Sequence, residues 1–87
     1  KNEEKLLASC YRSSFAAARE LGAKTIAFPS ISTGAYGFPL QRATEIAMEE
    51  TKKCLATDKT LSMVVFVCFG DKAYNTYQEV FKRIFRV

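Results

Sequence analysis

The sequence predicts an α/β fold that supplies one half of a three-layer α/β/α domain. Three stretches carry apolar residues at helical spacing. Two short apolar runs, at 25–28 and 61–69, lie between them, so the predicted order is helix, strand, helix, strand, helix. The second run contains "VVFVCF", which is apolar at every position. Such a pattern is typical of a strand that is buried on both faces of a parallel or mixed sheet.

The first half of the chain is predicted to contain a helix over about 3–21 and a strand over 25–28. Leu7, Tyr11, Phe15 and Ala18 fall on one face of this helix, and Gly22 is a suitable C-terminal stop.

A second helix is predicted over about 39–56, with Pro39 at the first helical position, where a missing N–H costs nothing. Asp71 is a candidate N-cap for the last helix. That helix carries Tyr74, Tyr77, Val80, Phe81, Ile84 and Phe85 on one side.

The strand–helix–strand unit requires a parallel pair of strands with a right-handed crossover. Two strands alone leave edges and a face uncovered, so we expect the remaining strands of a mixed, mostly parallel sheet on a partner segment. On this interpretation the isolated polypeptide folds poorly or aggregates. The alternative is a minimal two-stranded module, which would be marginally stable.

The length of the chain allows one domain at most, and its composition predicts an intracellular compartment. The chain has 87 residues, 48% hydrophobic residues and a net charge of +4. No apolar run approaches the ~20 residues that a membrane span requires, and the first residues carry no secretory signal. Three cysteines without a C-x-x-C motif indicate neither a disulfide framework nor a zinc site, and they favour a reducing compartment, cytoplasmic or nuclear. We expect all three, Cys10, Cys54 and Cys68, to be core residues.

Two features of charge and side-chain chemistry narrow the function. Positive residues are spread along the chain with a modest cluster at Lys82, Arg83 and Arg86, which is more typical of a solvated helix face and disfavours nucleic acid as a partner. There is no histidine, so the commonest general base and metal ligand are both absent. We predict no metal site.

The most informative stretch is "PSISTGAYGFP" at 29–39, between the first strand and the second helix. Open α/β sheets bind ligands where parallel strands end. Gly34 and Gly37 allow a ligand to approach the main chain, whose N–H groups near a helix N-terminus form an anion site. Tyr36 and Phe38 offer flat faces for a sugar or a base. A purely structural turn remains the alternative, because the stretch is neither a P-loop nor G-x-G-x-x-G.

The stretch "AFPSISTGAYGFPLQRATEIAMEE" resembles the diphosphate-binding loop and following helix of the macrodomain family, nearest to its bacterial and MacroD-type branch. "LLASCYRSSFAAARELGAKTIAFP" and "VVFVCFGDKAYNTY" also fit the C-terminal half of a macrodomain. The resemblance covers nearly the whole chain and implies that residues 1–87 are this half of one domain. It also implies that the N-terminal half is a complementary segment outside this sequence.

The resemblance implies that the backbone of Ser32, Thr33, Gly34, Ala35 and Tyr36 wraps the diphosphate of ADP-ribose. Tyr36 would also pack against the distal ribose. Gly37 and Phe38 would complete the turn. Phe69 would flank the adenine and its ribose, with a core residue at the end of the strand as the alternative.

The activity implied for the complete domain is hydrolysis of ADP-ribose esters, namely deacetylation of O-acetyl-ADP-ribose or removal of mono-ADP-ribose from proteins. The ligands would be ADP-ribose or O-acetyl-ADP-ribose, and an ADP-ribosylated protein would be a further partner, with no cofactor. The catalytic residues are expected in the N-terminal half, so this chain alone would be inactive. A non-catalytic ADP-ribose reader and a different βα nucleotide-binding fragment stay open as alternatives.

Overall fold

The computed structural model describes residues 3–30 and 39–86. It contains α1 (Glu3–Leu21), β1 (Thr25–Pro29), α2 (Leu40–Thr57), β2 (Met63–Val67) and α3 (Asp71–Phe85). The order and type of all five predicted elements are confirmed. β2 is shorter than the predicted strand over 61–69, because Leu61 and Ser62 still belong to the turn that brings the chain beside Lys24.

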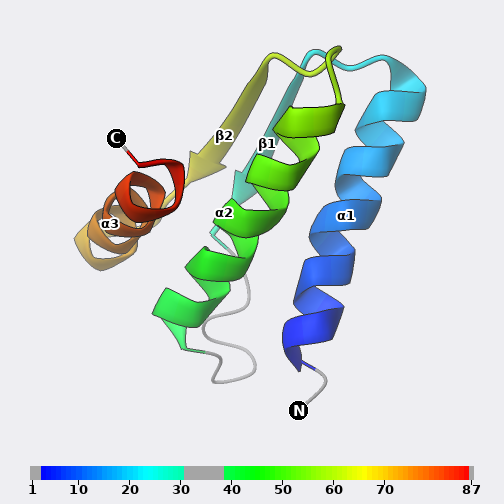
Figure 1. Ribbon diagram of the computed structural model, residues 1–87. Helices are drawn as coiled ribbons and strands as arrows, with labels where there is room; N and C mark the ends of the chain where they lie inside the picture. Colours follow the sequence, from blue (N-terminus) through cyan, green and yellow to red (C-terminus); the bar gives the residue numbers. More distant parts are fainter. Residues whose placement is uncertain (1–2, 31–38, 87) are drawn as a thin grey trace.

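The two strands form a parallel pair, as predicted. The register runs from Thr25 opposite Met63 to Pro29 opposite Val67. One further backbone hydrogen bond, from the Ser30 N–H to the Val67 carbonyl at 2.9 Å, extends the pairing past β1. The carboxyl ends of both strands therefore lie at the same edge of the sheet, and both strands run toward the end of the molecule at which α2 begins (Figure 1).

The helices form one layer in which α2 packs against both α1 and α3 (Figure 1). The core between this layer and the sheet is aromatic. Phe28 and Phe66 are neighbours across the strands, with ring centroids 5.6 Å apart. Tyr11 of α1 contacts Phe28 at 5.0 Å, and Tyr77 of α3 contacts Phe66 at 5.4 Å. This chain of rings fixes both outer helices to the sheet.

The opposite face of the sheet is bare in the part of the chain that the structure describes. The side chains of Met63, Val65 and Val67 alternate with the core positions of β2 and are 54%, 37% and 45% exposed. The "VVFVCF" pattern predicted burial on both faces, but only one face is covered here. The pattern and the structure are compatible if a further layer covers this apolar face.

Two helix starts differ from the sequence prediction by one residue. Pro39 is the N-cap of α2 and not its first helical residue, because its ψ of 131° is extended. Gly70, with φ of 98°, is the N-cap of α3, and Asp71 is the first helical residue without a side-chain capping bond. A positive φ favours glycine, which explains why the N-cap falls on Gly70. Asp71 instead places a negative charge in the first turn, where the helix dipole favours it.

Asp58 holds the turn between α2 and β2. Its buried carboxylate accepts hydrogen bonds from the N–H groups of Thr60 at 2.9 Å and Leu61 at 3.3 Å, and it lies 3.7 Å from Arg19 of α1.

We expect the substitution Asp58→Ala to lower the free energy of unfolding of the complete domain by about 1–3 kcal/mol, because it leaves buried N–H groups without an acceptor. Thermal and denaturant unfolding measure this change. The control Glu79→Ala removes an exposed carboxylate from α3 and should stay within about 0.5 kcal/mol of the wild type. Equal effects of the two substitutions would contradict the structural role of Asp58.

Candidate functional site

The candidate site lies at the edge of the sheet where both strands end. Ser30 follows β1, Phe69 follows β2, and Pro39 leads into α2. The pairing of Pro29 with Val67 and the bond from Ser30 to Val67 place the ends of β1 and β2 next to each other. Positions that are 39 residues apart in the sequence therefore meet at one edge.

Seven of the eight predicted ligand-binding residues lie outside the described residues. They are Ser32, Thr33, Gly34, Ala35, Tyr36, Gly37 and Phe38. Their roles stay predictions. The structure describes both flanks of this segment, namely the end of β1 at the candidate edge and the start of α2 on the same side of the molecule (Figure 1).

The N-terminus of α2 is suited to an anion. Its N-cap, Pro39, makes no side-chain capping bond, and the first turn contains no acidic residue. The first backbone N–H groups of any helix have no partner within the helix, and residues 3–30 and 39–86 supply no acceptor for those of α2. These N–H groups and the positive end of the helix dipole favour a phosphate at this position.

Arg42, in the first turn of α2, does not act as a spare cation for that ligand. Its guanidinium binds Glu4 of α1 and Glu45, each at 3.0 Å. The hydrogen bond to Glu4, and then that to Glu45, raise the pKa of Arg42 above its ordinary value. Arg42 therefore ties α1 to the start of α2. Sequence reasoning missed this contact because Glu4 and Arg42 are 38 residues apart.

Phe69 is the one predicted ligand-binding residue that the structure describes. Its side chain is 71% exposed, just beyond the end of β2. Within this chain it is therefore not a core residue, which was the alternative interpretation. An exposed aromatic ring at the carboxyl edge of the sheet is available for a flat ligand group.

The cysteines were all predicted to be core residues, and this prediction is wrong for Cys10, which is exposed on α1. The i, i+3/i+4 pattern did not separate Cys10 from its neighbour Tyr11, and Tyr11 occupies the buried position. Cys54 is buried and Cys68 is half-buried. Burial raises the pKa of both thiols, and nearby Asp58 raises that of Cys54 further, so these two thiols favour the neutral form that is a poor nucleophile.

Residues 3–30 and 39–86 contain no cluster of three or more cysteine or acidic side chains arranged to hold a metal ion. None of the helices they form has the length and apolar character to cross a membrane.

Two parallel strands joined through a crossover helix define an α/β domain, and open α/β sheets generally bind their ligands at the carboxyl edge of the sheet. The family model for the Macro domain matches residues 1–47 of this chain. The chain belongs to the macrodomain family.

Curated relatives support this assignment across most of the chain. Macro domain-containing protein CT2219 of Chlorobaculum tepidum is 47% identical over 77 residues, which are 88% of this chain and 45% of the relative. O-acetyl-ADP-ribose deacetylase 2 of Pantoea vagans is 45% identical over 76 residues, which are 87% of this chain and 44% of that protein. The chain thus spans less than half the length of the curated relatives it matches.

Solved structures show the same arrangement. The Oceanobacillus iheyensis macrodomain with ADP matches 98% of this chain with a TM-score of 0.91 and 35% identity, over 44% of its own length. The Trypanosoma brucei macrodomain in complex with ADP-ribose matches 87% of this chain with a TM-score of 0.84 and 42% identity, over 33% of its own length. The predicted α/β macrodomain fold is therefore confirmed for the elements this chain contains.

Proposed function

We propose that this chain supplies one side of an ADP-ribose site at the carboxyl edge of its sheet. The observation that carries the proposal is the N-terminus of α2, which has no capping partner among the described residues and is the next element after β1, whose carboxyl end lies beside that of β2. This position suits the diphosphate of the ligand, because open helix N–H groups stabilise negative charge. The complex of the related Trypanosoma brucei macrodomain with ADP-ribose supports the choice of ligand.

The residues between β1 and α2 would hold the ligand by their backbone and hydroxyl groups. In this proposal, the 32–36 segment wraps the diphosphate, Tyr36 packs against the distal ribose, and Gly37 and Phe38 complete the turn. Phe69 takes the adenine side, consistent with its exposed ring at the end of β2.

We infer that the bare sheet face is covered by the N-terminal half of the domain. The chain matches less than half of each relative, and its uncovered positions on β2 are all apolar. Each strand also has one edge without a partner among the described residues, since the sheet order is β1-β2. The missing half would pair with these edges, and we place this chain as the C-terminal half.

The complete domain would hydrolyse ADP-ribose esters, with O-acetyl-ADP-ribose or an ADP-ribosylated protein as substrate, in the cytoplasm or nucleus. The name of the Pantoea vagans relative supports a deacetylase activity. This chain would position the substrate. By holding the diphosphate and the distal ribose, it would fix the ester carbon in place for attack by water. The residues that activate the water would belong to the N-terminal half. The alternative is a domain that binds ADP-ribose without cleaving it.

Two measurements on the complete domain test the proposal. Isothermal titration calorimetry with ADP-ribose should give saturable binding, and release of acetate from O-acetyl-ADP-ribose should follow enzyme concentration. Binding of ADP-ribose without release of acetate would exclude the hydrolase activity and would favour a domain that binds ADP-ribose without cleaving it. If the complete domain bound another nucleotide but not ADP-ribose, both the proposed ADP-ribose binding and the proposed hydrolysis would be overturned.

The role of Phe69 leads to a prediction for the binding affinity. We expect Phe69→Ala to weaken ADP-ribose binding by roughly 1–3 kcal/mol, the usual loss when a stacked aromatic is removed from a base. The matched control is Leu21→Ala, which shortens another exposed apolar side chain at the far end of α1 and should leave the affinity unchanged. Calorimetry on both variants, with melting curves, checks this. An unchanged affinity for Phe69→Ala would remove Phe69 from the site.

A further inference from the structure

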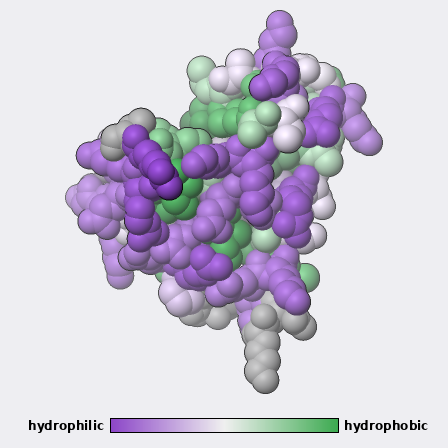
Figure 2. Space-filling model, viewed as in Figure 1, coloured by the Kyte–Doolittle hydropathy of each residue, from purple (hydrophilic) through white to green (hydrophobic). Residues whose placement is uncertain are grey.

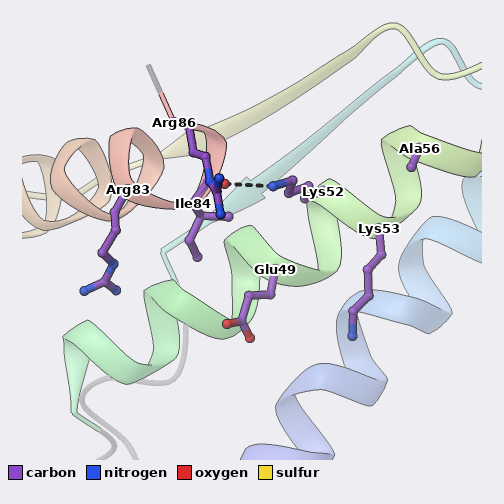
Figure 3. A pocket seen from close by; sticks show the side chains of 7 residues that line it. All are labelled: Glu49, Lys52, Lys53, Ala56, Arg83, Ile84 and Arg86. Carbon is purple, nitrogen blue, oxygen red and sulfur yellow. Dashed lines mark hydrogen bonds between the residues drawn. The ribbon is translucent and has the colours of Figure 1, made fainter.

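A second candidate binding surface is an open groove between the C-terminal half of α2 and the C-terminal end of α3. The groove has a volume of about 700 Å³ (Figure 3). Four of its seven lining side chains are cationic, and one is a carboxylate: the lining consists of Glu49, Lys52, Lys53, Ala56, Arg83, Ile84 and Arg86. In Figure 2, hydrophilic residues dominate this side of the molecule.

Two of the four cations are held in place by the fold. The Lys52 ammonium donates a hydrogen bond to the Ile84 carbonyl at 2.9 Å, drawn as a dashed line in Figure 3. The Arg83 guanidinium binds Glu45 at 2.6 Å, so Arg83 is held in place but, like Arg42, is already paired with a carboxylate. Glu45 also binds Arg42, and the hydrogen bonds from Arg83 and then Arg42 lower the pKa of Glu45. Fixed cations bind an anion with less loss of side-chain entropy than mobile ones.

The positive charge of the groove is only partly neutralised by neighbouring carboxylates. Lys52 and Arg86 have no carboxylate partner in the described part of the chain, since the one bond of Lys52 is to a neutral carbonyl. Lys53 lies 3.7 Å from Glu50, which is already bound to Arg12 at 3.0 Å. The side chain of Lys53 is 73% exposed. Glu49 is the single acid in the lining, so positive charge remains in excess.

Helix-end electrostatics account for only part of this cluster. Basic residues in the last turn of α3 complement the negative end of its dipole, which explains Lys82 and Arg83. Lys52 and Lys53, however, come from α2 and precede its last turn. Sequence reasoning interpreted the C-terminal cations as a solvated helix face. The fold adds two lysines that lie about 30 residues away in the sequence, and a surface with this excess of charge attracts anions.

We propose that this groove binds an extended anion of linked phosphate groups, at a position distinct from the proposed ADP-ribose site. α3 begins at the ligand edge and ends at the groove. Its 15 residues separate the two positions by ~22 Å along the helix axis. The shared chemistry is a row of phosphates, which either a nucleic-acid strand or inorganic polyphosphate supplies.

Fluorescence anisotropy on the complete macrodomain tests this proposal. The probe is a labelled single-stranded oligonucleotide of about 12 nucleotides, a length that matches common single-strand sites. Saturating ADP-ribose is present to occupy the other site, and unlabelled inorganic polyphosphate is the competitor. Competition by polyphosphate identifies phosphates alone as sufficient, whereas its failure to compete identifies the nucleic-acid strand as the ligand. Binding of the probe that is seen without ADP-ribose but lost at saturating ADP-ribose overturns the proposal, and so does no binding at about 50 mM salt.

The double variant Lys52→Gln with Arg86→Gln should weaken probe binding about tenfold or more and reduce the slope of log K against log salt by ~1.4, or ~0.7 for each lost phosphate contact. The charge-matched control, Lys5→Gln with Lys24→Gln, removes two exposed cations that do not line the groove and should retain the wild-type slope. ADP-ribose affinity should be unchanged in both. Because Lys52 also bonds to the backbone of α3, Arg86→Gln alone provides a second test. If the test and control variants weaken probe binding equally, the proposal that this groove binds the probe is refuted.

Discussion

Replacing Val65 by aspartate is expected to prevent folding of the complete macrodomain, although Val65 is 37% exposed in this chain. The expectation follows from the proposal that the N-terminal half covers the sheet face carrying Met63, Val65 and Val67. Aspartate at the centre of that face would bury an unpaired carboxylate between two apolar layers. The cost is at least ~4 kcal/mol, a large part of the stability of a typical domain. Soluble yield, circular dichroism and thermal melting of the complete domain measure this loss.

The matched control for Val65→Asp is Ser13→Asp, which introduces the same charge at an exposed position on α1. It should melt within about 0.5 kcal/mol of the wild type. If Val65→Asp also folds normally, the sheet face is exposed to solvent in the complete domain. The isolated 87-residue chain provides the complementary observation. A cooperative, monomeric melt of this chain alone would contradict its need for a partner segment.

Replacing Gly34 by valine is expected to weaken ADP-ribose binding about 100-fold, or ~2.7 kcal/mol. The proposed role of the segment requires a close approach between its backbone and the diphosphate, and a branched side chain would obstruct that approach. Calorimetry with ADP-ribose measures the loss. The melting temperature should change little, so that the loss reflects the site and not the fold.

The control for Gly34→Val is Ala17→Val, which places a valine at an exposed position on α1 and should leave the affinity as it is. Wild-type affinity in Gly34→Val would show that this segment is not the binding site. Phe69→Ala tests the adenine side independently. If only one of the two variants keeps wild-type affinity, the role of that one residue is wrong. If both keep it, the assignment of the whole edge is wrong.

The five elements and the parallel pairing follow from patterns within short stretches of sequence. The α1 face with Leu7, Tyr11 and Phe15 repeats every three to four residues, and these residues are buried. Side-chain spacing along one element depends only on local backbone geometry, so it is readable without the fold. The resemblance to macrodomains likewise rests on short stretches such as the one that contains Ser-Thr-Gly. The family assignment is confirmed.

Other features depended on which segments the tertiary structure brings together. The exposure of Phe69 required the structure, because an apolar residue at the end of a strand looks the same in the sequence whether it packs in the core or not. A bare face on the sheet was expected, but the structure was needed to show that Met63, Val65 and Val67 form it. The position of the α3 N-cap at Gly70 was also decided by the structure, which shows that Gly70 has a φ of 98°.

The sequence by itself determined the type and order of the elements, the family, and the stretch that joins β1 to α2 as the expected ligand-binding segment. Only the tertiary structure decided where charge accumulates. Lys52 and Lys53 line the same open groove as Arg83 and Arg86 because α2 packs against α3, and Glu45 reaches Arg83 across 38 residues of sequence. Electrostatic interaction depends on distance in space, and distances between helices are set by the packing of their buried faces. Those distances are not encoded in the spacing of the charges along the chain.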